Sequence, residues 1–472
     1  MRRPCTSVKP CSIVRSAPIR CSWSGPPGSD THPEASHTGR RALRRRDGET
    51  TPTAEARHMR VAIAPQGSSL LANALTPLRD FPDFRSLWWS TLYASSAWWA
   101  QNVVLAWLAF DLTGSELAVS AAAAAGFAPM LLGPLGGLLA DRVHRPRLLI
   151  GAQLLALGAG SVIALLVTLD RAEYWHVLVA AWLVGMSMAP LMPMRFTLTI
   201  DLVGERRVSS ANAVNAVGML GSRMVVPAVA GALIATFGVD VALWFSAAWY
   251  IPASWPLIGI RDERGGHSPA PGAALGEIVQ GFRYALANRA LRALLVVTVL
   301  ANTFAWPVIL GFLPVFAEEV FDVGAAGLGL IVGVNGLGAL LGALGIASLG
   351  DFRRKGMLYL LATVLFGVAL TAFAVSGVFA LALVLIFIAG AGSAGFGVMQ
   401  STVTMLLAPP DSRGRVLGVL MLSIGVLPGA MLVQGAVASA IGVVATTAVS
   451  GVLLGALTLM VTASSPELRR AS

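Results

Sequence analysis

The stretch GGLLADRVHRPR, residues 136–147, is a short charged segment between two long apolar runs. The runs cover residues 117–139 and 148–169, and the segment between them holds one aspartate and three arginines. Short loops rich in arginine stay on the cytoplasmic side of a membrane. The stretch therefore indicates a cytoplasmic loop that joins two membrane-spanning helices.

The composition of the whole chain agrees with a membrane protein. Of its 472 residues, 56% are hydrophobic and only 12% are charged, whereas a soluble domain carries about 25% charged residues. The net charge is +10, and residues 1–60 supply +7 of it, from 12 Lys and Arg against 5 Asp and Glu. The positive charge therefore belongs to a tail and to loops, and it does not indicate nucleic-acid binding.

Signatures of soluble enzymes, nucleotide sites and metal centres are absent from the sequence. The cysteines, Cys5, Cys11 and Cys21, all lie near the N-terminus and have no histidine at zinc-site spacing. The two lysines, Lys9 and Lys355, do not belong to a phosphate-binding P-loop. We therefore expect no cofactor and no metal, and an ion gradient rather than ATP as the energy source.

The first 80 residues are rich in Arg, Ser, Pro, Thr and Gly and show no apolar period. This composition predicts a disordered basic arm without a signal peptide. Met59 opens a more ordinary lead-in and is a candidate start of the native chain. A basic segment lying on anionic lipid is the alternative for this arm.

Twelve apolar runs are each long enough to span a bilayer, which takes about 20 residues. They divide six and six, into halves 81–260 and 291–465, with a polar cytoplasmic connector at 261–290 and a tail at 466–472. We therefore predict an all-α integral membrane fold of twelve transmembrane helices in two pseudo-symmetric halves. The runs cover residues 86–111, 117–140, 147–169, 174–199, 209–237, 240–259, 291–317, 324–349, 356–376, 378–407, 414–438 and 440–463.

The arginines and lysines after residue 80 fix the expected orientation. If the N-terminus is inside, nearly all of them fall at or near the inner face, whereas Arg171 falls outside and Arg223 falls within a span. This asymmetry predicts a multi-pass protein of the inner (plasma) membrane with both termini in the cytoplasm.

The opening loop resembles the signature between helices 2 and 3 of the major facilitator superfamily, G-x-x-x-D-R/K-x-G-R-R/K. Gly137, Asp141, Arg142 and Arg145 fall on that pattern. A weaker copy, GIASLGDFRRK at residues 345–355, carries Asp351 and Arg353. Two such loops, about 210 residues apart, are typical of a transporter built from repeated halves.

Further segments resemble one branch of that superfamily, the enterobactin-exporter-like or macrolide-efflux-like transporters. Together they extend over nearly all of the chain from about residue 80 to 465. The resemblance implies the major facilitator fold, alternating access and proton antiport. The segments are residues 81–115, 192–214, 222–238, 312–343 and 411–422, the last of which contains Arg413.

Arg195 and Asp201 close the fourth predicted span. Arg195 could pair with Asp201 or with Asp141, and such pairs resemble the inner gate of the family. An ordinary arginine at the inner face is the alternative.

Arg223 lies about fourteen residues into the fifth predicted span. A charge within the membrane costs about 2.5–3.5 kcal/mol on insertion scales and usually marks function or a paired site. With Pro227 and Gly231 it resembles the fifth-helix element of the superfamily's antiporters. Arg223 could face the cavity and bind an anionic group, or it could be a structural bolt held by backbone carbonyls.

Several amides lie in the middle of predicted spans. Gln101, Asn102, Asn302 and Gln400 are candidates for the lining of a substrate cavity, with Trp306 as an aromatic wall. Because buried amides need partners, hydrogen bonding between helices is the alternative.

Carboxylates are missing from the middle of the spans. Asp111 and Glu318, which end the first and seventh spans, are the nearest candidates for proton coupling. A solvated helix end is the alternative for both, so the coupling ion is inferred from the resemblance alone.

These features predict a secondary transporter that exports amphipathic small molecules such as a drug, a macrolide or a siderophore. Its expected partners are that substrate, protons and the lipid bilayer. A nutrient importer of the same fold and a non-transporting membrane sensor or scaffold are the alternatives. The intact loop charges favour a working transporter.

Overall fold

The computed structural model describes residues 76–132, 144–188, 191–204, 207–260, 280, 282–350, 352–409 and 413–471. Within these ranges the regular elements are helices, and none is a strand. Most of the predicted basic arm and most of the predicted connector lie outside them. Residues 76–80, which the sequence analysis assigned to the arm, are helical, and Asp80 pairs with Arg207 at 2.9 Å.

The first half of the body begins with a 32-residue helix, α2 (Pro82–Thr113). Gly114 ends it in the left-handed conformation, at φ 57°, which glycine adopts without steric cost. The elements that follow are α3 (Glu116–Phe127), η2 (Ala128–Leu132), α5 (Arg145–Thr168), α6 (Tyr174–Met188), α7 (Leu191–Val203), α8 (Val208–Phe237), α9 (Val239–Ala248), α10 (Tyr250–Ser254) and η3 (Trp255–Leu257).

The second half begins at α12 (Arg289–Phe304), which Asn288 caps by accepting hydrogen bonds from two backbone N–H groups. The same segment continues past Pro307 through two short π-helical turns. The elements are η4 (Val308–Phe312), α13 (Leu313–Val315), η5 (Phe316–Val320), α14 (Gly324–Ser348), α15 (Lys355–Val375), α16 (Phe379–Leu407), α17 (Arg413–Ile424), α18 (Leu427–Ile441), α19 (Val443–Ser464) and α20 (Pro466–Arg469).

Eight helices in the described ranges are long and apolar enough to cross a membrane. Two shorter apolar helices, Glu116–Leu131 and Tyr174–Met188, fall within the second and fourth predicted spans. The long helix α2 is not among the eight, because its tryptophans, serines and amides lower its hydropathy. A multi-pass membrane protein is thus confirmed, and the count of twelve stays a prediction.

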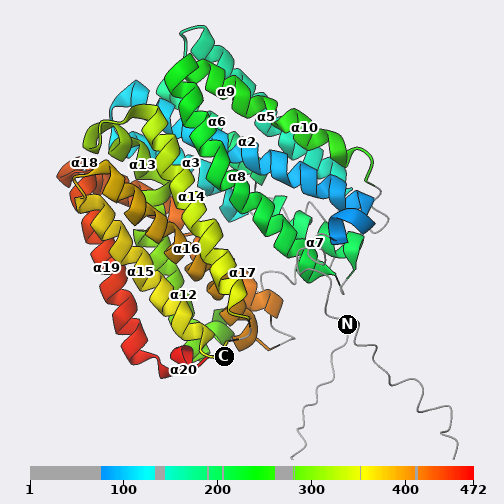
Figure 1. Ribbon diagram of the computed structural model, residues 1–472, viewed down its shortest axis with the longest axis vertical. Helices are drawn as coiled ribbons and strands as arrows, with labels where there is room; N and C mark the ends of the chain where they lie inside the picture. The colour runs from blue at the N-terminus through cyan, green and yellow to red at the C-terminus, as the bar shows by residue number, and fades with distance from the viewer. Residues whose placement is uncertain are drawn as a thin grey trace, which may run out of the picture. The chain divides into compact units, whose positions relative to one another are not determined.

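Two helix pairs join the first half of the sequence to the second. Helix α3 packs on α18, and α8 packs on α14; α8 and α14 lie side by side in Figure 1. Helices α3 and α18 fall in predicted spans 2 and 11, and α8 and α14 fall in spans 5 and 8. Because span 8 in the second half corresponds to span 2 in the first, and span 11 to span 5, the two contacts are equivalent if the halves are exchanged. This relationship is what a two-fold pseudo-symmetry between the halves would produce.

Glycines bring α8 and α14 into backbone contact. A Cβ on Gly336 would lie 2.6 Å from the carbonyl oxygen of Arg223, and one on Gly333 would lie 2.7 Å from that of Met224. By contrast, Gly221 in α8 and Gly345 in α14 have open space around them. The close contacts between the two backbones therefore run from Arg223 to Gly231 of α8.

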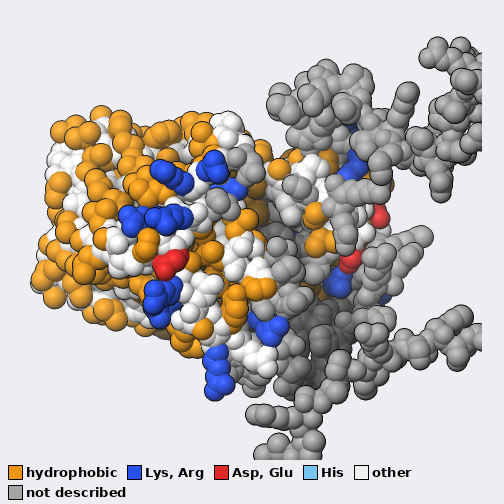
Figure 2. Space-filling model, turned by 90° about the horizontal axis from the view of Figure 1, so that it is seen from below, with side chains coloured by type: hydrophobic (Ala, Val, Ile, Leu, Met, Phe, Trp, Pro, Cys, Tyr) orange, Lys and Arg blue, Asp and Glu red, His pale blue; other side chains and the backbone are white. Residues whose placement is uncertain are grey.

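Apolar side chains cover the flanks of the helical body. Trp255, Ile258, Phe237 and Met460 are each at least 66% exposed, which suits a surface solvated by lipid tails. Basic side chains gather at one end, seen in Figure 2. We call this the basic end; it holds the starts of α5, α8, α12 and α15, at Arg145, Val208, Arg289 and Lys355.

Candidate substrate site and inner gate

Arg223 is one of two buried charged side chains in the described ranges, with 8% exposure. Its Nη2 atom donates a hydrogen bond of 2.6 Å to Oδ1 of Asn335. Its guanidinium lies over the rings of Trp99, at 5.1 Å, and Trp306, at 5.7 Å. Such cation–π contacts contribute about 0.5–2 kcal/mol each, most where water is excluded.

The partners of Arg223 come from widely separated parts of the chain. Trp99 belongs to α2, Asn335 to α14, and Trp306 follows α12 where that helix is interrupted. Asn335 in turn donates to the carbonyl of Ile386 in α16, at 3.1 Å. Arg223 therefore joins the two halves of the sequence.

The Nε atom of Arg223 is buried and makes no hydrogen bond to the described residues. A buried donor without an acceptor costs about 1–3 kcal/mol, and more on a charged group. The arginine is held by an amide and two indole rings rather than by backbone carbonyls. It thus keeps one donor for a group that the described protein residues do not supply.

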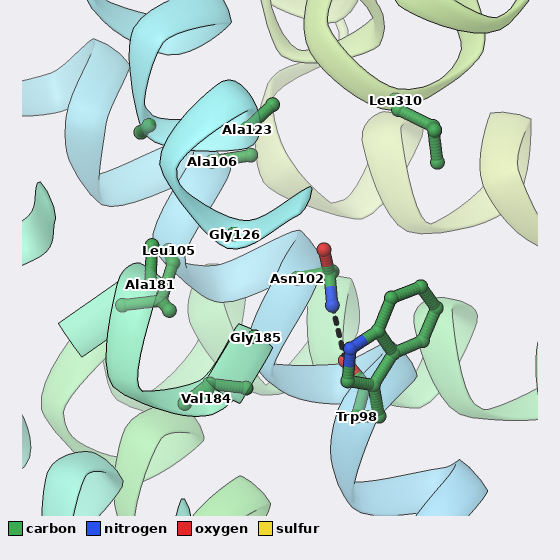
Figure 3. A pocket seen from close by; sticks show the side chains of 11 residues that line it. Trp98, Asn102, Leu105, Ala106, Ala123, Gly126, Ala181, Val184, Gly185 and Leu310 are labelled. Carbon is green, nitrogen blue, oxygen red and sulfur yellow. Dashed lines mark hydrogen bonds between the residues drawn. The ribbon is translucent and has the colours of Figure 1, made fainter. Parts of the chain in front are cut away.

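A narrow pocket lies beside this centre. Asn102, Trp98 and Gly126 line it on one side and Leu310 faces them from the other half, as Figure 3 shows. The amide of Asn102 donates to the carbonyl of Trp98 at 2.8 Å. The volume of the pocket is about 20 Å³, roughly what one water needs, so a drug-sized molecule does not fit in this pocket.

Gln101 points away from that pocket and into the packing of the first half. Its Oε1 accepts a hydrogen bond from the hydroxyl of Tyr250 at 3.1 Å, and its Nε2 lies against Gly160. Nearby, Gln153 donates to Ser90 at 3.1 Å and accepts from Ser254 at 2.9 Å. These contacts join α2, α5 and α10, which is the interhelical role that was the alternative for Gln101.

Asn302 and Gln400 belong to a second buried network, in the other half. Gln400 Nε2 donates to the hydroxyl of Thr298 at 2.9 Å, and that hydroxyl lies 3.1 Å from the hydroxyl of Tyr359. Asn302 donates to the carbonyl of Thr298 at 2.9 Å. The network joins α12, α15 and α16, so these amides too bind between or within helices.

Of the two carboxylates considered as partners of Arg195, Asp141 lies outside the described residues and Asp201 does not pair with it. Asp201 instead pairs with Arg145 at 2.6 Å, because the start of α5 reaches the end of α7. Both residues belong to the first half, so the pair joins two helices of one half and does not latch the halves together. Arg195 is buried, and its Nη2 makes no hydrogen bond to the described residues.

The other loop candidates are only partly covered. Gly137, Asp141, Arg142 and Asp351 lie outside the described residues. Arg353 is exposed just before α15, and Arg413 begins α17. Their gate role stays a prediction.

The fifth-helix element lies inside the α8–α14 contact. Pro227 is within α8, and a Cβ on Gly329 would lie 2.6 Å from its carbonyl oxygen. Gly231 lies directly against Ala325 and Gly329. The element therefore allows close helix packing at the place where Arg223 meets Asn335.

The two carboxylates considered for proton coupling are on the surface. Asp111 is near the end of α2 and Glu318 is in η5, and both are exposed. Among the described residues, the buried charged side chains are the arginines 195 and 223. Both positions agree with the alternative to proton coupling, in which each carboxylate is simply a solvated residue at a helix end.

Comparison with known proteins gives matches over most of the chain. A family model described as a transmembrane secretion effector matches residues 72–471. The multidrug efflux pump Tap of Mycolicibacterium fortuitum is 29% identical over 358 residues, which are 73% of this chain and 86% of that protein. Macrolide efflux protein A of Streptococcus pyogenes is 24% identical and covers 65% of this chain and 76% of that protein.

Solved structures share the fold at low sequence identity. A mutant of the peptide transporter POT in complex with alafosfalin has a TM-score of 0.69 at 14% identity, over 83% of this chain and 96% of that one. The nucleoside transporter NupG, also as a mutant, has a TM-score of 0.64 at 12% identity, over 82% and 99% of the two chains. The helical arrangement is therefore that of known transporters.

Proposed function

Because the chain belongs to the family of transmembrane secretion effectors in the major facilitator superfamily, we propose that it exports amphipathic small molecules, such as a drug or a macrolide, by alternating access. The named efflux pumps among its relatives support the outward direction. The drive we propose is a proton gradient. A siderophore is a further candidate substrate.

The architecture that fits this function is twelve helices in two six-helix halves, with both termini in the cytoplasm. The α3–α18 and α8–α14 pairs support it, because the two contacts exchange under a shift of six spans. The basic end supports the orientation, since short loops rich in arginine stay inside.

The observation that carries the proposal is the contact of Arg223 with Asn335 between Trp99 and Trp306. It places a charge with a spare donor at the interface of the halves, where alternating access needs its substrate site. Two indole rings offer a flat apolar surface to a bulky ligand, and Arg223 Nε offers a donor to a carbonyl, hydroxyl or anionic group. A site with an apolar surface and one polar donor suits an amphipathic substrate.

The glycine contact between α8 and α14 lies where a change between the two states of alternating access would act. The backbones of α8 and α14 touch from Arg223 to Gly231. Rocking of the halves against each other would part this glycine contact and change which groups surround Arg223.

Drug accumulation in cells that over-express the protein tests the function. A panel of fluorescent dyes, macrolides and siderophores is measured with and without a protonophore. An exporter lowers the accumulation of at least one compound, and the protonophore removes that effect. Accumulation that rises with expression would favour an importer, and a panel on which expression has no effect would favour the sensor or scaffold.

A further inference from the structure

A groove at the basic end lies between α12 and the junction of α19 with α20. Arg289, Arg292 and Val296 line it from α12, at spacings of three and four residues that place them on one helix face. Val461 and Ser464 line it from α19, and Glu467 from α20. Its volume of about 520 Å³ falls within the roughly 300–1,000 Å³ of ligand sites.

The groove changes from polar to apolar along its length. Arg289 and Val296 are seven residues apart, or about 10 Å along the helix at 1.5 Å per residue. Along α12, Arg292 lies between Arg289 and Val296, and along the facing segment, Ser464 lies between Glu467 and Val461. A ligand that fills this groove must therefore have a polar head and an apolar tail on one molecule.

The charge at the polar end is positive. Glu467 is the acid that lines the groove, and it pairs with Arg289 at 3.7 Å with both side chains largely exposed, a pair that contributes little. Arg292 reaches a backbone carbonyl at 3.5 Å. Figure 2 shows basic side chains around a small acidic patch on this face.

The walls of the groove are fixed by packing. Leu468 of α20 is fully buried, and a Cβ on Gly356 of α15 could not fit beside its carbonyl. The N–H of Gly356 also donates to the carbonyl of Ala471 at 3.1 Å. The short helix α20 is thus held against α15, and the groove is a built feature of the fold.

We propose that this groove binds an anionic phospholipid of the leaflet at the basic end, with the phosphate at Arg289 and Arg292 and an acyl chain along Val296 and Val461. Val296 is 43% exposed on the lipid-facing flank, so a lipid can enter sideways. The site lies apart from Arg223 and does not depend on the direction of transport or on the exported compound.

The test is native mass spectrometry of the purified full chain with phosphatidylglycerol and with phosphatidylcholine. The Arg289→Gln/Arg292→Gln double variant is compared with Arg353→Gln/Arg354→Gln, which removes the same charge from the same end but outside the groove. We expect phosphatidylglycerol affinity to fall about thirtyfold in the groove variant, or about 2 kcal/mol at ~1 kcal/mol per arginine. We expect a change of less than about threefold in the control. Equal losses in both, or none in either, would overturn the proposal.

A second variant keeps the charge and fills the apolar half of the groove. Val296→Trp should weaken phosphatidylglycerol binding while both arginines remain. Excess glycerol 3-phosphate, a soluble head group, should not displace the lipid from the wild type. Full lipid binding by Val296→Trp, or full displacement by glycerol 3-phosphate, would reduce the groove to a simple anion site and contradict the lipid assignment.

Discussion

Arg223 in α8 donates a hydrogen bond of 2.6 Å to Asn335 in α14, and the two residues are 112 positions apart in the chain. The bond crosses between the halves of the sequence at the point where the two helix backbones begin to touch. It is therefore placed to respond when the halves move. Four predictions follow from this contact and its surroundings.

Arg223→Ala should lower transport at least about tenfold, because it removes the hydrogen bond that we propose Arg223 donates to the substrate. A hydrogen bond from a charged group contributes about 1.5–3 kcal/mol, and about 1.4 kcal/mol corresponds to a factor of ten. Arg223→Lys keeps the charge but not the planar group that lies over Trp99 and Trp306, so its transport should be intermediate. Efflux rates in membrane vesicles measure both, with Arg171→Ala as the control, since Arg171 is an exposed arginine between α5 and α6. Equal transport by the alanine variant and the wild type would exclude Arg223 from the site.

Asn335→Asp should strengthen the contact with Arg223 and slow turnover. The substitution places a carboxylate on Arg223, and charge-assisted bonds are about twice as strong as neutral ones. The substitution also replaces the amide donor that bonds the Ile386 carbonyl at 3.1 Å, so the unfolding temperature should change little while the transport rate falls. Asn335→Leu, which leaves the guanidinium without its acceptor, should lower both the unfolding temperature and the transport rate. A rise in transport by Asn335→Asp would show that this bond does not limit the movement of the halves.

Gly336→Ala should destabilise the fold, because a Cβ there would lie 2.6 Å from the carbonyl oxygen of Arg223. The Arg223 carbonyl belongs to a helix backbone and cannot rotate away as a side chain can. Overpacking of this kind lowers the free energy of unfolding by about 1–3 kcal/mol. Gly345→Ala in the same helix faces open space and should be neutral or slightly stabilising. Chemical unfolding in detergent compares the two, and equal effects would contradict the close helix contact.

Asp201→Asn should have a small effect. The pair with Arg145 is partly exposed, at 16% and 27% of the two side chains, and such pairs contribute about 0.2–1 kcal/mol. Because both residues belong to the first half, transport should fall far less than in Arg223→Ala. A complete loss of transport with an unchanged unfolding temperature would show that the pair acts as a gate.

The sequence predicted the helical membrane fold well, because an apolar run of about 20 residues has few other uses. It also marked Arg223, since a lone charge in such a run is costly. It did not reveal that Asn335 is the hydrogen-bond partner of Arg223. Contacts 112 residues apart depend on how helices pack, which hydropathy does not encode.

The pairing of Arg195 with Asp201 did not hold for the same reason, because hydropathy does not encode how helices pack. Arg195 and Asp201 are close in sequence, yet Asp201 lies within reach of Arg145 once α5 and α7 are packed. In the same way, mid-span position marked Gln101 and Gln400 as polar but could not say which way they face. Their partners Tyr250 and Thr298 come from helices whose rotation only the folded structure fixes.

Transport in proteoliposomes with an imposed pH gradient tests the central claim most directly. The measurement follows a compound that the cellular panel identifies, for the wild type and for Arg223→Ala reconstituted at equal amounts. The account predicts movement of the compound opposite to the proton gradient for the wild type, collapse of that movement when the gradient is removed, and little movement for Arg223→Ala. Wild-type movement that is indifferent to the gradient, or full activity of Arg223→Ala, would contradict it.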